Sequence, residues 1–216
     1  MTGESPNATQ LAAIQDAFVK ALAALGRVRT YPKNTVFITE GDSSDSVFVV
    51  LSGKVKVFVS DNEGREMILD THGPGEYVGE MAMDGKPRSA SVMTLEPTTF
   101  SVVARDPIRE AIRKNPDFAL DMIAKVIDRA RLATSSVKHL ALLDVYGRVA
   151  RLLLEMAVET DGKLLIPDKI TQQEIAERVG ASRDMVSRIF RDLTIGGYIT
   201  VEHRMITINK KPPARW

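Results

Sequence analysis

Residues 171–190, TQQEIAERVGASRDMVSRIF, decide how the C-terminal part of the chain folds. Thr171 and Glu174 have the spacing of a capping box, which begins a helix by satisfying free backbone N–H groups. Gly180 stands where a tight turn can require a positive φ angle, and Ser182 can cap a second helix. This pattern is typical of a helix-turn-helix, whose second helix suits the DNA major groove.

The second helix of this pattern places apolar and polar residues on opposite faces. Val186 and Ile189 fall on the inner face, and arginines on the outer face can donate two hydrogen bonds to guanine. Residues at the start of the first helix can touch phosphate. The predicted DNA-contacting residues are Thr171, Gln172, Ser182, Arg183, Asp184, Ser187, Arg188 and Arg204. The alternative is an ordinary helical hairpin with solvated charges.

The segments around this motif complete a DNA-binding unit. A helix is expected over 145–159, and apolar runs at 198–201 and 205–208 indicate a hairpin, or wing, with Arg204 at its tip.

A long helix is expected to begin at Asn115 and Pro116. No Pro or Gly then occurs until Gly147. Apolar residues recur at the alternating spacing of a coiled-coil seam, and they include Ile123, Val126, Ala130, Ala133 and Val137. A narrow seam favours a symmetric dimer; the alternative is packing on the chain's own β domain.

Residues 28–105 have the texture of an antiparallel β domain. Short β-branched and aromatic runs at 35–39, 47–51, 55–60, 66–69, 91–93 and 98–103 alternate with Gly, Pro and Asn turns. This spacing predicts a jelly-roll type of sandwich or barrel. A short helix over 11–25 is expected to precede it.

Residues 78–91, VGEMAMDGKPRSAS, suggest an anion site within the β domain. The backbone beside Gly79 can bond an anion, Arg88 supplies a two-pronged cation, and Ser89 adds a hydroxyl donor. Glu80 is an acceptor suited to a sugar hydroxyl. The alternative is a surface ion pair between Glu80 and Arg88.

We call residues 78–91 the cassette. Together with the helix-turn-helix and the segments at 61–69 and 140–154, the cassette makes the chain resemble the catabolite-activator (CRP/FNR) family of transcription regulators. The resemblance runs from about residue 28 to 208. It implies an α+β protein: an N-terminal β-roll (jelly roll) that binds a cyclic nucleotide, a long dimerisation helix and a C-terminal winged helix-turn-helix. The expected boundaries are 11–115, 116–143 and 144–216.

The resemblance also implies roles for individual residues. Glu80 would bond the ribose, while Arg88 and Ser89 would hold the cyclic phosphate. The full set of expected ligand-binding residues is Gly79, Glu80, Met81, Arg88, Ser89, Thr134, Leu69 and Asp70. Asp144 would cap the first helix of the DNA-binding domain. Partners would be palindromic double-stranded DNA, a second copy of the chain and RNA polymerase.

The expected effector is cAMP, with cyclic di-GMP or no ligand as alternatives. The sequence departs from cAMP-responsive members of the family at Ala133 and Asp70 and in a shorter loop before Arg88. The absence of cysteine excludes the iron–sulfur branch. We expect His72 to be a turn residue, not a haem ligand.

Composition excludes several other classes of protein. The 216 residues hold 29 Lys+Arg, 28 Asp+Glu and no Cys, so disulfides and thiol catalysis are absent. The sequence has no metal-spaced His cluster and no nucleophile–base motif, and we predict no enzyme. A nucleotide-binding regulatory subunit of an enzyme and a purely structural coiled-coil dimer are the rival classes.

The even charge balance conceals an asymmetry. Residues 1–144 hold 17 basic and 19 acidic residues, whereas 178–216 hold 8 and 3. A basic C-terminal region suits phosphate contacts.

No apolar run reaches the roughly 18 residues of a membrane span, and the N-terminus lacks a signal-peptide pattern. We therefore expect a cytoplasmic protein without a membrane partner.

Overall fold

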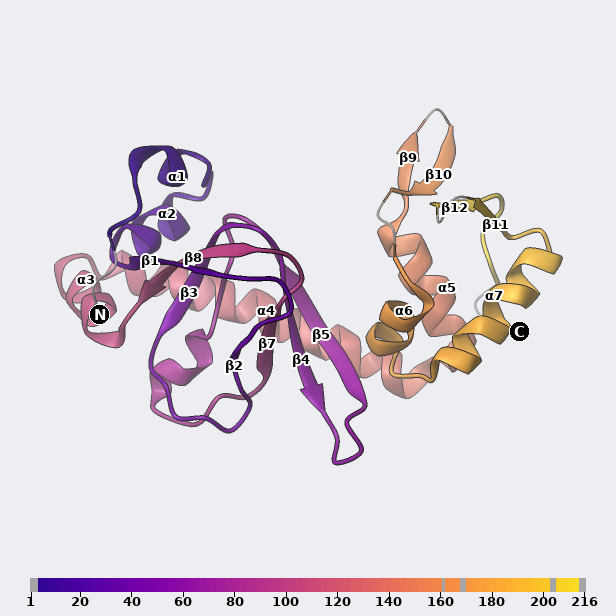
Figure 1. Cartoon of the computed structure of the whole chain (residues 1–216), viewed down its shortest axis with the longest axis horizontal. Helices are drawn as coiled ribbons and strands as arrows, with labels where there is room; N and C mark the ends of the chain where they lie inside the picture. Colours follow the sequence, from indigo (N-terminus) through magenta and orange to yellow (C-terminus); the bar gives the residue numbers. More distant parts are fainter. Residues whose placement is uncertain (1–3, 161, 168–169, 203–204, 214–216) are drawn as a thin grey trace. The chain divides into compact units, whose positions relative to one another are not determined.

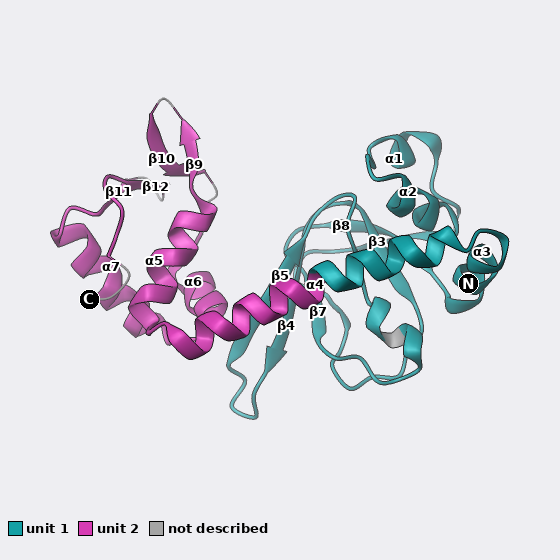
Figure 2. Cartoon of the chain, turned by 180° about the vertical axis from the view of Figure 1, so that it is seen from behind, with its two compact units in different colours: residues 1–128 teal, residues 129–216 magenta. Residues whose placement is uncertain are grey.

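The computed structural model describes residues 4–213 apart from 161, 168–169 and 203–204 (Figure 1). The chain divides into two compact units, residues 1–128 and 129–216, with the boundary inside one long helix (Figure 2). Each unit has its own hydrophobic core.

The first unit is built from two antiparallel four-stranded sheets, with helices before and after them. One sheet has the strand order β1-β8-β3-β6 and the other β2-β7-β4-β5. In chain order the elements are α1 (Ala8–Ala12), α2 (Ala17–Ala24), β1 (Arg27–Tyr31), β2 (Val36–Ile38), β3 (Val47–Ser52), β4 (Val55–Ser60), β5 (Glu66–His72), β6 (Tyr77–Val78), the 3-10 helix η1 (Glu80–Asp84), β7 (Ser91–Thr94), β8 (Thr98–Val103), α3 (Arg105–Lys114) and α4 (Asp117–Leu142).

Strand β3 explains how the first unit is layered. Its first five residues, VFVVL, are all buried, so both faces of this strand are covered. Val47 and Val49 belong to a core shared with α2, α3 and α4. Phe48 and Val50, which point the opposite way, belong to a second core shared with β2, β4, β7 and β8. A continuous apolar run therefore joins the helical layer to the inside of the β-roll.

Strand β1 forms one edge of its sheet. The segment before α1 runs along this edge, where Val28 N donates to Glu4 O at 2.8 Å and Arg27 Nη1 donates to Ser5 Oγ at 3.3 Å. Arg27 and Arg29 are exposed on the strand.

The first half of α4 packs against the β domain through one face only. Phe118 is buried against Phe18 of α2, with ring centroids 4.8 Å apart, and Met122 packs on the same core. Lys125 Nζ lies 2.6 Å from a carboxylate oxygen of Asp16. None of these three α4 residues belongs to the predicted seam, so their packing does not support the alternative in which the seam packs on the chain's own β domain.

The predicted seam of α4 lies on a different face. Ile123 is 53% exposed and Val137 is 65% exposed, and Val126, Ala130 and Ala133 are also exposed. Nothing in the described chain covers these side chains to the level of a core residue, so the helix presents an apolar face to its surroundings.

The second unit holds the C-terminal part of α4 and a small winged domain. Its further elements are α5 (Val145–Met156), β9 (Val158–Thr160), β10 (Lys163–Ile166), α6 (Gln172–Val179), α7 (Arg183–Ile195), β11 (Ile199–Glu202) and β12 (Met205–Ile208). The strands form one antiparallel sheet of order β11-β12-β10-β9.

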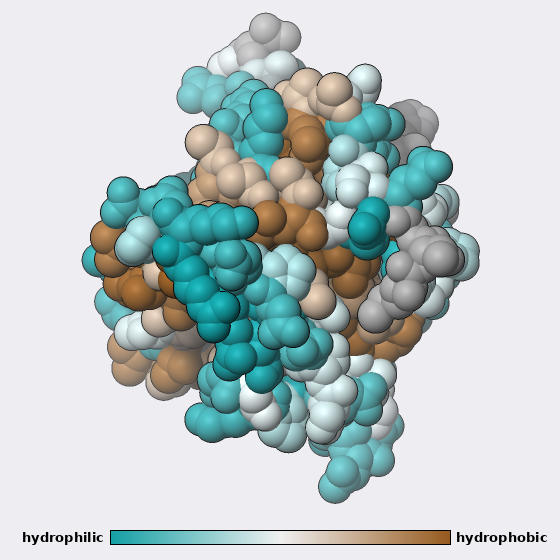
Figure 3. Space-filling model, turned by 90° about the vertical axis from the view of Figure 1, so that its left-hand side faces the viewer, coloured by the Kyte–Doolittle hydropathy of each residue, from teal (hydrophilic) through white to brown (hydrophobic). Residues whose placement is uncertain are grey.

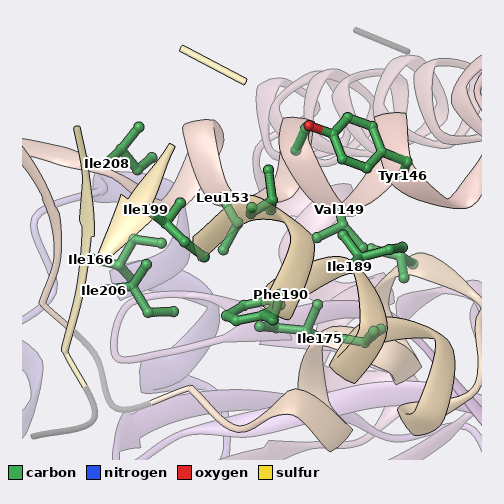
Figure 4. Close-up of a cluster of buried hydrophobic side chains, with 14 of the residues drawn as sticks. Tyr146, Val149, Leu153, Ile166, Ile175, Ile189, Phe190, Ile199, Ile206 and Ile208 are labelled. Atoms are coloured by element: carbon green, nitrogen blue, oxygen red, sulfur yellow. The ribbon is translucent and has the colours of Figure 1, made fainter. Parts of the chain in front are cut away.

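The core of the winged domain gathers side chains from its three helices and from the sheet (Figure 4). Leu153 of α5, Ile175 of α6 and Leu193 of α7 are almost fully buried, as is Ile166 of β10. The helix-turn-helix therefore packs on a hydrophobic core to which the wing contributes side chains.

Most predicted elements are confirmed, with the following differences. The structure has strands at each of the six predicted runs. The helix predicted over 145–159 is shorter in the structure, where α5 ends at Met156. The single helix expected over 11–25 is wrong: α1 and α2 are separate, because Asp16 caps α2 at Val19 N. Helix α3, the short strands β1 and β6 and the β9–β10 hairpin were not expected.

No helix among the described residues is both long and apolar enough to cross a bilayer. On the face seen in Figure 3, hydrophilic side chains lie between the hydrophobic ones.

We predict that Asp16 stabilises the first unit both as a helix cap and as an ion-pair partner. The hydrogen bond from Lys125 keeps the pKa of Asp16 below its usual value. This stabilisation is present above the unfolded-state pKa and is lost as the pH falls through the folded-state pKa. Asp16→Asn keeps a good cap but removes the charge, and should lower the free energy of unfolding by about 0.5–1 kcal/mol at neutral pH.

Asp16→Ala also removes the cap and should cost about 1 kcal/mol more. Urea unfolding at pH 7 and at pH 3 checks both effects. The difference between wild type and Asp16→Asn should shrink at the lower pH. An equal difference at both pH values would remove the ion-pair contribution.

Candidate ligand and nucleic-acid sites

Arg88 lies at the centre of the predicted anion site and is only 5% exposed. Its Nη1 donates to Gly79 O at 2.7 Å, and its Nη2 donates to Ser44 Oγ and Ser46 O, each at 2.7 Å. The side chain thus joins the cassette at 78–91 to the loop between β2 and β3. Among the described residues, Arg88 Nε is buried and has no hydrogen-bond partner.

Carboxylates accompany this buried cation. Asp45 and Glu80 both act electrostatically on Arg88, while burial lowers its pKa. An arginine remains charged despite such a shift. Glu80 is itself buried, at the first residue of η1. The alternative of a surface ion pair between Glu80 and Arg88 does not fit, because both side chains are buried.

Gly79 allows the backbone to approach the guanidinium. Its φ is +89°, which side-chain-bearing residues rarely adopt, and a Cβ here would lie 2.6 Å from Arg88 Nη1 and 3.0 Å from Ser46 O. The buried Arg88 Nε and this close backbone turn are features that suit an anionic group.

The other expected ligand-binding residues of the first unit lie on η1, β5 and the loop before β7. Ser89 is exposed and its Oγ donates to Met81 Sδ at 3.3 Å. Met81 and Leu69 are exposed large apolar side chains. Asp70 is exposed and accepts a hydrogen bond from Thr71 N at 2.7 Å.

His72 is not a turn residue, contrary to expectation. It is the last residue of β5 and is buried, with its ring nitrogens 3.5 Å from an Asp70 oxygen and 3.4 Å from a Glu76 oxygen. Alternation along the strand places it on the same face as Val55, its cross-strand partner.

Thr134 lies on α4, next to the seam residue Ala133, and is exposed. Its Oγ1 donates to Ala130 O at 2.9 Å, one turn back on the same helix. The hydroxyl oxygen keeps acceptor capacity.

The helix-turn-helix has the local geometry that the sequence predicts. Thr171 caps α6, and the reciprocal bonds with Glu174 form a capping box. Gly180 adopts a left-handed conformation with φ 63° at the end of α6. Ser182 Oγ then accepts from Met185 N at 3.2 Å and caps α7.

The predicted DNA-contacting side chains gather on one exposed face of α7. Arg183, Asp184, Ser187 and Arg188 are exposed, while Val186 and Ile189 are buried beneath them. Thr171 is exposed at the start of α6, where Gln172 is half-buried. Arg204 lies outside the described residues.

Sequence reasoning missed the groups that hold the two arginines in place. Ser44 and Ser46 accept from Arg88, and their signal was only a polar loop, GDSSDS at 41–46. Arg148 of α5, which bonds three backbone carbonyls, had no sequence signal beyond its place after the predicted cap Asp144. That cap is present, since Gly147 N donates to Asp144 Oδ1 at 2.7 Å.

Comparisons with known families agree with this architecture. Residues 28–115 match the cyclic nucleotide-binding domain family, and residues 147–212 match the Crp-like helix-turn-helix domain family. The cAMP-activated global transcriptional regulator CRP of Escherichia coli O6:H1 is 32% identical over 187 residues, covering 84% of this chain and 89% of that protein.

The chain belongs to the CRP/FNR family. It is a transcription regulator with a cyclic nucleotide-binding domain and a DNA-binding domain, and its relatives are regulators, not enzymes. The CRP-like cAMP-activated global transcriptional regulator of Mycobacterium tuberculosis is 29% identical over 201 residues, which are 91% of this chain and 90% of that protein.

A solved structure shares the fold. The c-di-GMP responsive global regulator CLP of Xanthomonas campestris superposes with a TM-score of 0.77 at 22% identity, covering 94% of this chain and 100% of that one. The expected fold class is thereby confirmed.

We predict that Gly79→Ala disturbs the site more than a comparable glycine substitution elsewhere. Both Gly79 and Gly64 have a positive φ, but a Cβ at Gly64 meets open space. Each change should lower stability by about 1–2 kcal/mol through the backbone conformation. Only Gly79→Ala should also displace the Arg88 guanidinium.

Thermal unfolding and cAMP titration of both variants check this prediction. Gly64→Ala should retain the wild-type nucleotide affinity, whereas Gly79→Ala should reduce it. Equal behaviour of the two variants would show that the close approach at Gly79 is unimportant.

Proposed function

We propose that the protein is a homodimeric transcription regulator whose binding to a palindromic DNA site is gated by cAMP in the β-roll. The observation that carries the ligand part is Arg88, a buried guanidinium with an unpaired Nε beside the turn at Gly79. The curated relatives named as cAMP-activated support cAMP over cyclic di-GMP.

The phosphate of the nucleotide would bind at Arg88 and Ser89. An arginine has five N–H donors, and three of the bonds from Arg88 go to protein acceptors. Donors including Nε remain for an anion. Gly79 and Met81 would lie at the same wall.

The sugar and the base would contact groups on either side of the phosphate. Glu80 is a buried acceptor suited to the ribose 2′-hydroxyl. The exposed apolar side chains of Met81 and Leu69 can cover a base, and Asp70 and Thr134 can offer polar contacts.

The dimer would form along α4. Its exposed apolar seam, Ile123, Val126, Ala130, Ala133 and Val137, would pack against the same seam of a second copy, and its alanines allow a close approach. A two-fold dimer would then present two copies of α7 to half-sites one DNA turn, about 34 Å, apart.

The exposed face of α7 would read base edges in the major groove. Arg183 and Arg188 have the donor forks that match guanine, and Asp184 can accept from cytosine. Thr171, Gln172, Ser182, Ser187 and Arg204 would position the domain on the DNA backbone. RNA polymerase would be the further partner of the bound complex.

Arg88→Ala is expected to abolish cAMP binding, because the phosphate loses its charged donor. Isothermal titration with cAMP, cGMP and cyclic di-GMP measures the effect and also decides which nucleotide the wild type prefers. Arg65→Ala, which removes an exposed arginine on the β4–β5 hairpin, should bind as the wild type does.

Since Arg88 also joins two loops, its removal could unfold the domain. Arg88→Lys keeps a charge but not the planar fork, and should bind at least about tenfold more weakly while remaining folded by circular dichroism. Undiminished binding by a folded Arg88 variant would reject the phosphate role.

Arg188→Ala is expected to weaken specific DNA binding by about 1–3 kcal/mol and to relax base preference at one position of each half-site. Binding to duplexes selected by the wild type from a random pool, measured by gel shift, checks this. Arg113→Ala on α3 changes the net charge equally and should leave binding intact. Loss of affinity in both variants alike would point to charge alone.

A further inference from the structure

Arg148, on the first turn of α5, connects three helices of the second unit. Its Nη1 donates to Leu143 O at 2.9 Å, directly after the end of α4. Its Nε donates to Val179 O at 2.8 Å, and its Nη2 lies 3.5 Å from Gly180 O. Both of these carbonyls belong to the C-terminal end of α6.

These acceptors are the kind that a helix end leaves unsatisfied. The last carbonyls of a helix have no intrahelical partner, and the end carries a partial negative charge. A cation is favourable there. One planar guanidinium therefore serves the chain leaving α4 and the end of α6 together, with its donors in a fixed geometry.

The surroundings of Arg148 keep its own position fixed. Asp144 caps α5 through Gly147 N, and Arg148 N donates to Asp144 O at 3.0 Å. Tyr146, Gly147 and Val149, which flank Arg148 in sequence, are buried. The side chain thus extends from a rigid first turn towards the turn of the helix-turn-helix.

We propose that Arg148 is a positioning residue that fixes the helix-turn-helix relative to the end of α4 and so sets the spacing of the two DNA half-sites. This inference rests on the proposed dimeric DNA-binding function. In a dimer joined along α4, the direction in which each α6–α7 pair leaves that helix determines the separation of the recognition helices. Arg148 touches no base and is not needed to read one.

The proposal separates two properties that a general loss of structure would change together. Without Arg148, α7 keeps its exposed side chains and its core, so discrimination among bases within a half-site persists. The separation of the two half-sites is no longer fixed, so discrimination among spacer lengths is lost.

The experiment uses the full chain and a palindrome that the wild type selects from a randomised duplex pool. The spacer between half-sites is then lengthened or shortened by one and two base pairs, and affinity is measured by fluorescence anisotropy, with cAMP present and absent. Wild type should prefer one spacer by about tenfold or more, and Arg148→Ala should reduce this preference to about twofold or less. Its preference for the correct base within a half-site should change by no more than about twofold.

Arg151→Ala is the matched control. Arg151 lies three residues further along α5, is exposed and pairs with Glu155 at 2.6 Å, so its removal changes the charge equally without freeing a helix end. It should keep the wild-type spacer preference. Arg148→Lys should restore part of that preference, since an ammonium can bond a carbonyl but lacks the fork.

Three results would overturn the proposal. Arg148→Ala could keep the spacer preference, could lose spacer and base discrimination in proportion, or could be matched by Arg151→Ala. If Arg148→Ala is unfolded by circular dichroism, Arg148→Lys carries the same comparison. A wild type that selects no duplex would instead reject the DNA-binding function on which the inference rests.

Discussion

The burial of Arg88 is the constraint on which the ligand site depends. A guanidinium removed from water must be surrounded by acceptors, and the chain supplies Gly79 O, Ser44 Oγ and Ser46 O from two separate loops. This requirement fixes a glycine at position 79, because a Cβ there would meet Nη1. It also fixes the β2–β3 loop, so the cassette and that loop form one arrangement around a single charge.

The long helix α4 has two different apolar faces. Phe118, Met122 and Lys125 pack on the first unit, whereas the seam residues, which begin at Ile123, are exposed. A helix with a single apolar stripe would serve only the packing on the first unit, so the exposed seam is a second apolar face. In a member of this family, α4 is the helix that connects the nucleotide-binding domain with the DNA-binding domain.

Much of the architecture could be predicted from the sequence, and the remainder depends on contacts made across the fold. Strands β4 and β8 and the capped helices α6 and α7 were predictable because alternation, capping boxes and turn glycines are local signals. Helix α3 was missed because Pro107 breaks a helix at most positions, although in α3 it stands in the first turn, where a proline is tolerated. The β9–β10 hairpin has no alternating pattern, as Val158–Thr160 is exposed throughout. The types of site residue at 78–91 followed from the sequence. Ser44 and Ser46, which accept from Arg88, and Val179 and Gly180, which accept from Arg148, come from distant segments that no spacing rule connects.

The edge strand β1 bears on how readily copies of the chain can aggregate. An open sheet edge is a template for intermolecular strand pairing and fibrillar aggregation. Here the N-terminal segment occupies part of that template through the bond from Val28 N to Glu4 O, and Arg27 and Arg29 place like charges along the rest. Removal of the first residues would therefore promote aggregation at high protein concentration before it changed the affinity for nucleotide or DNA.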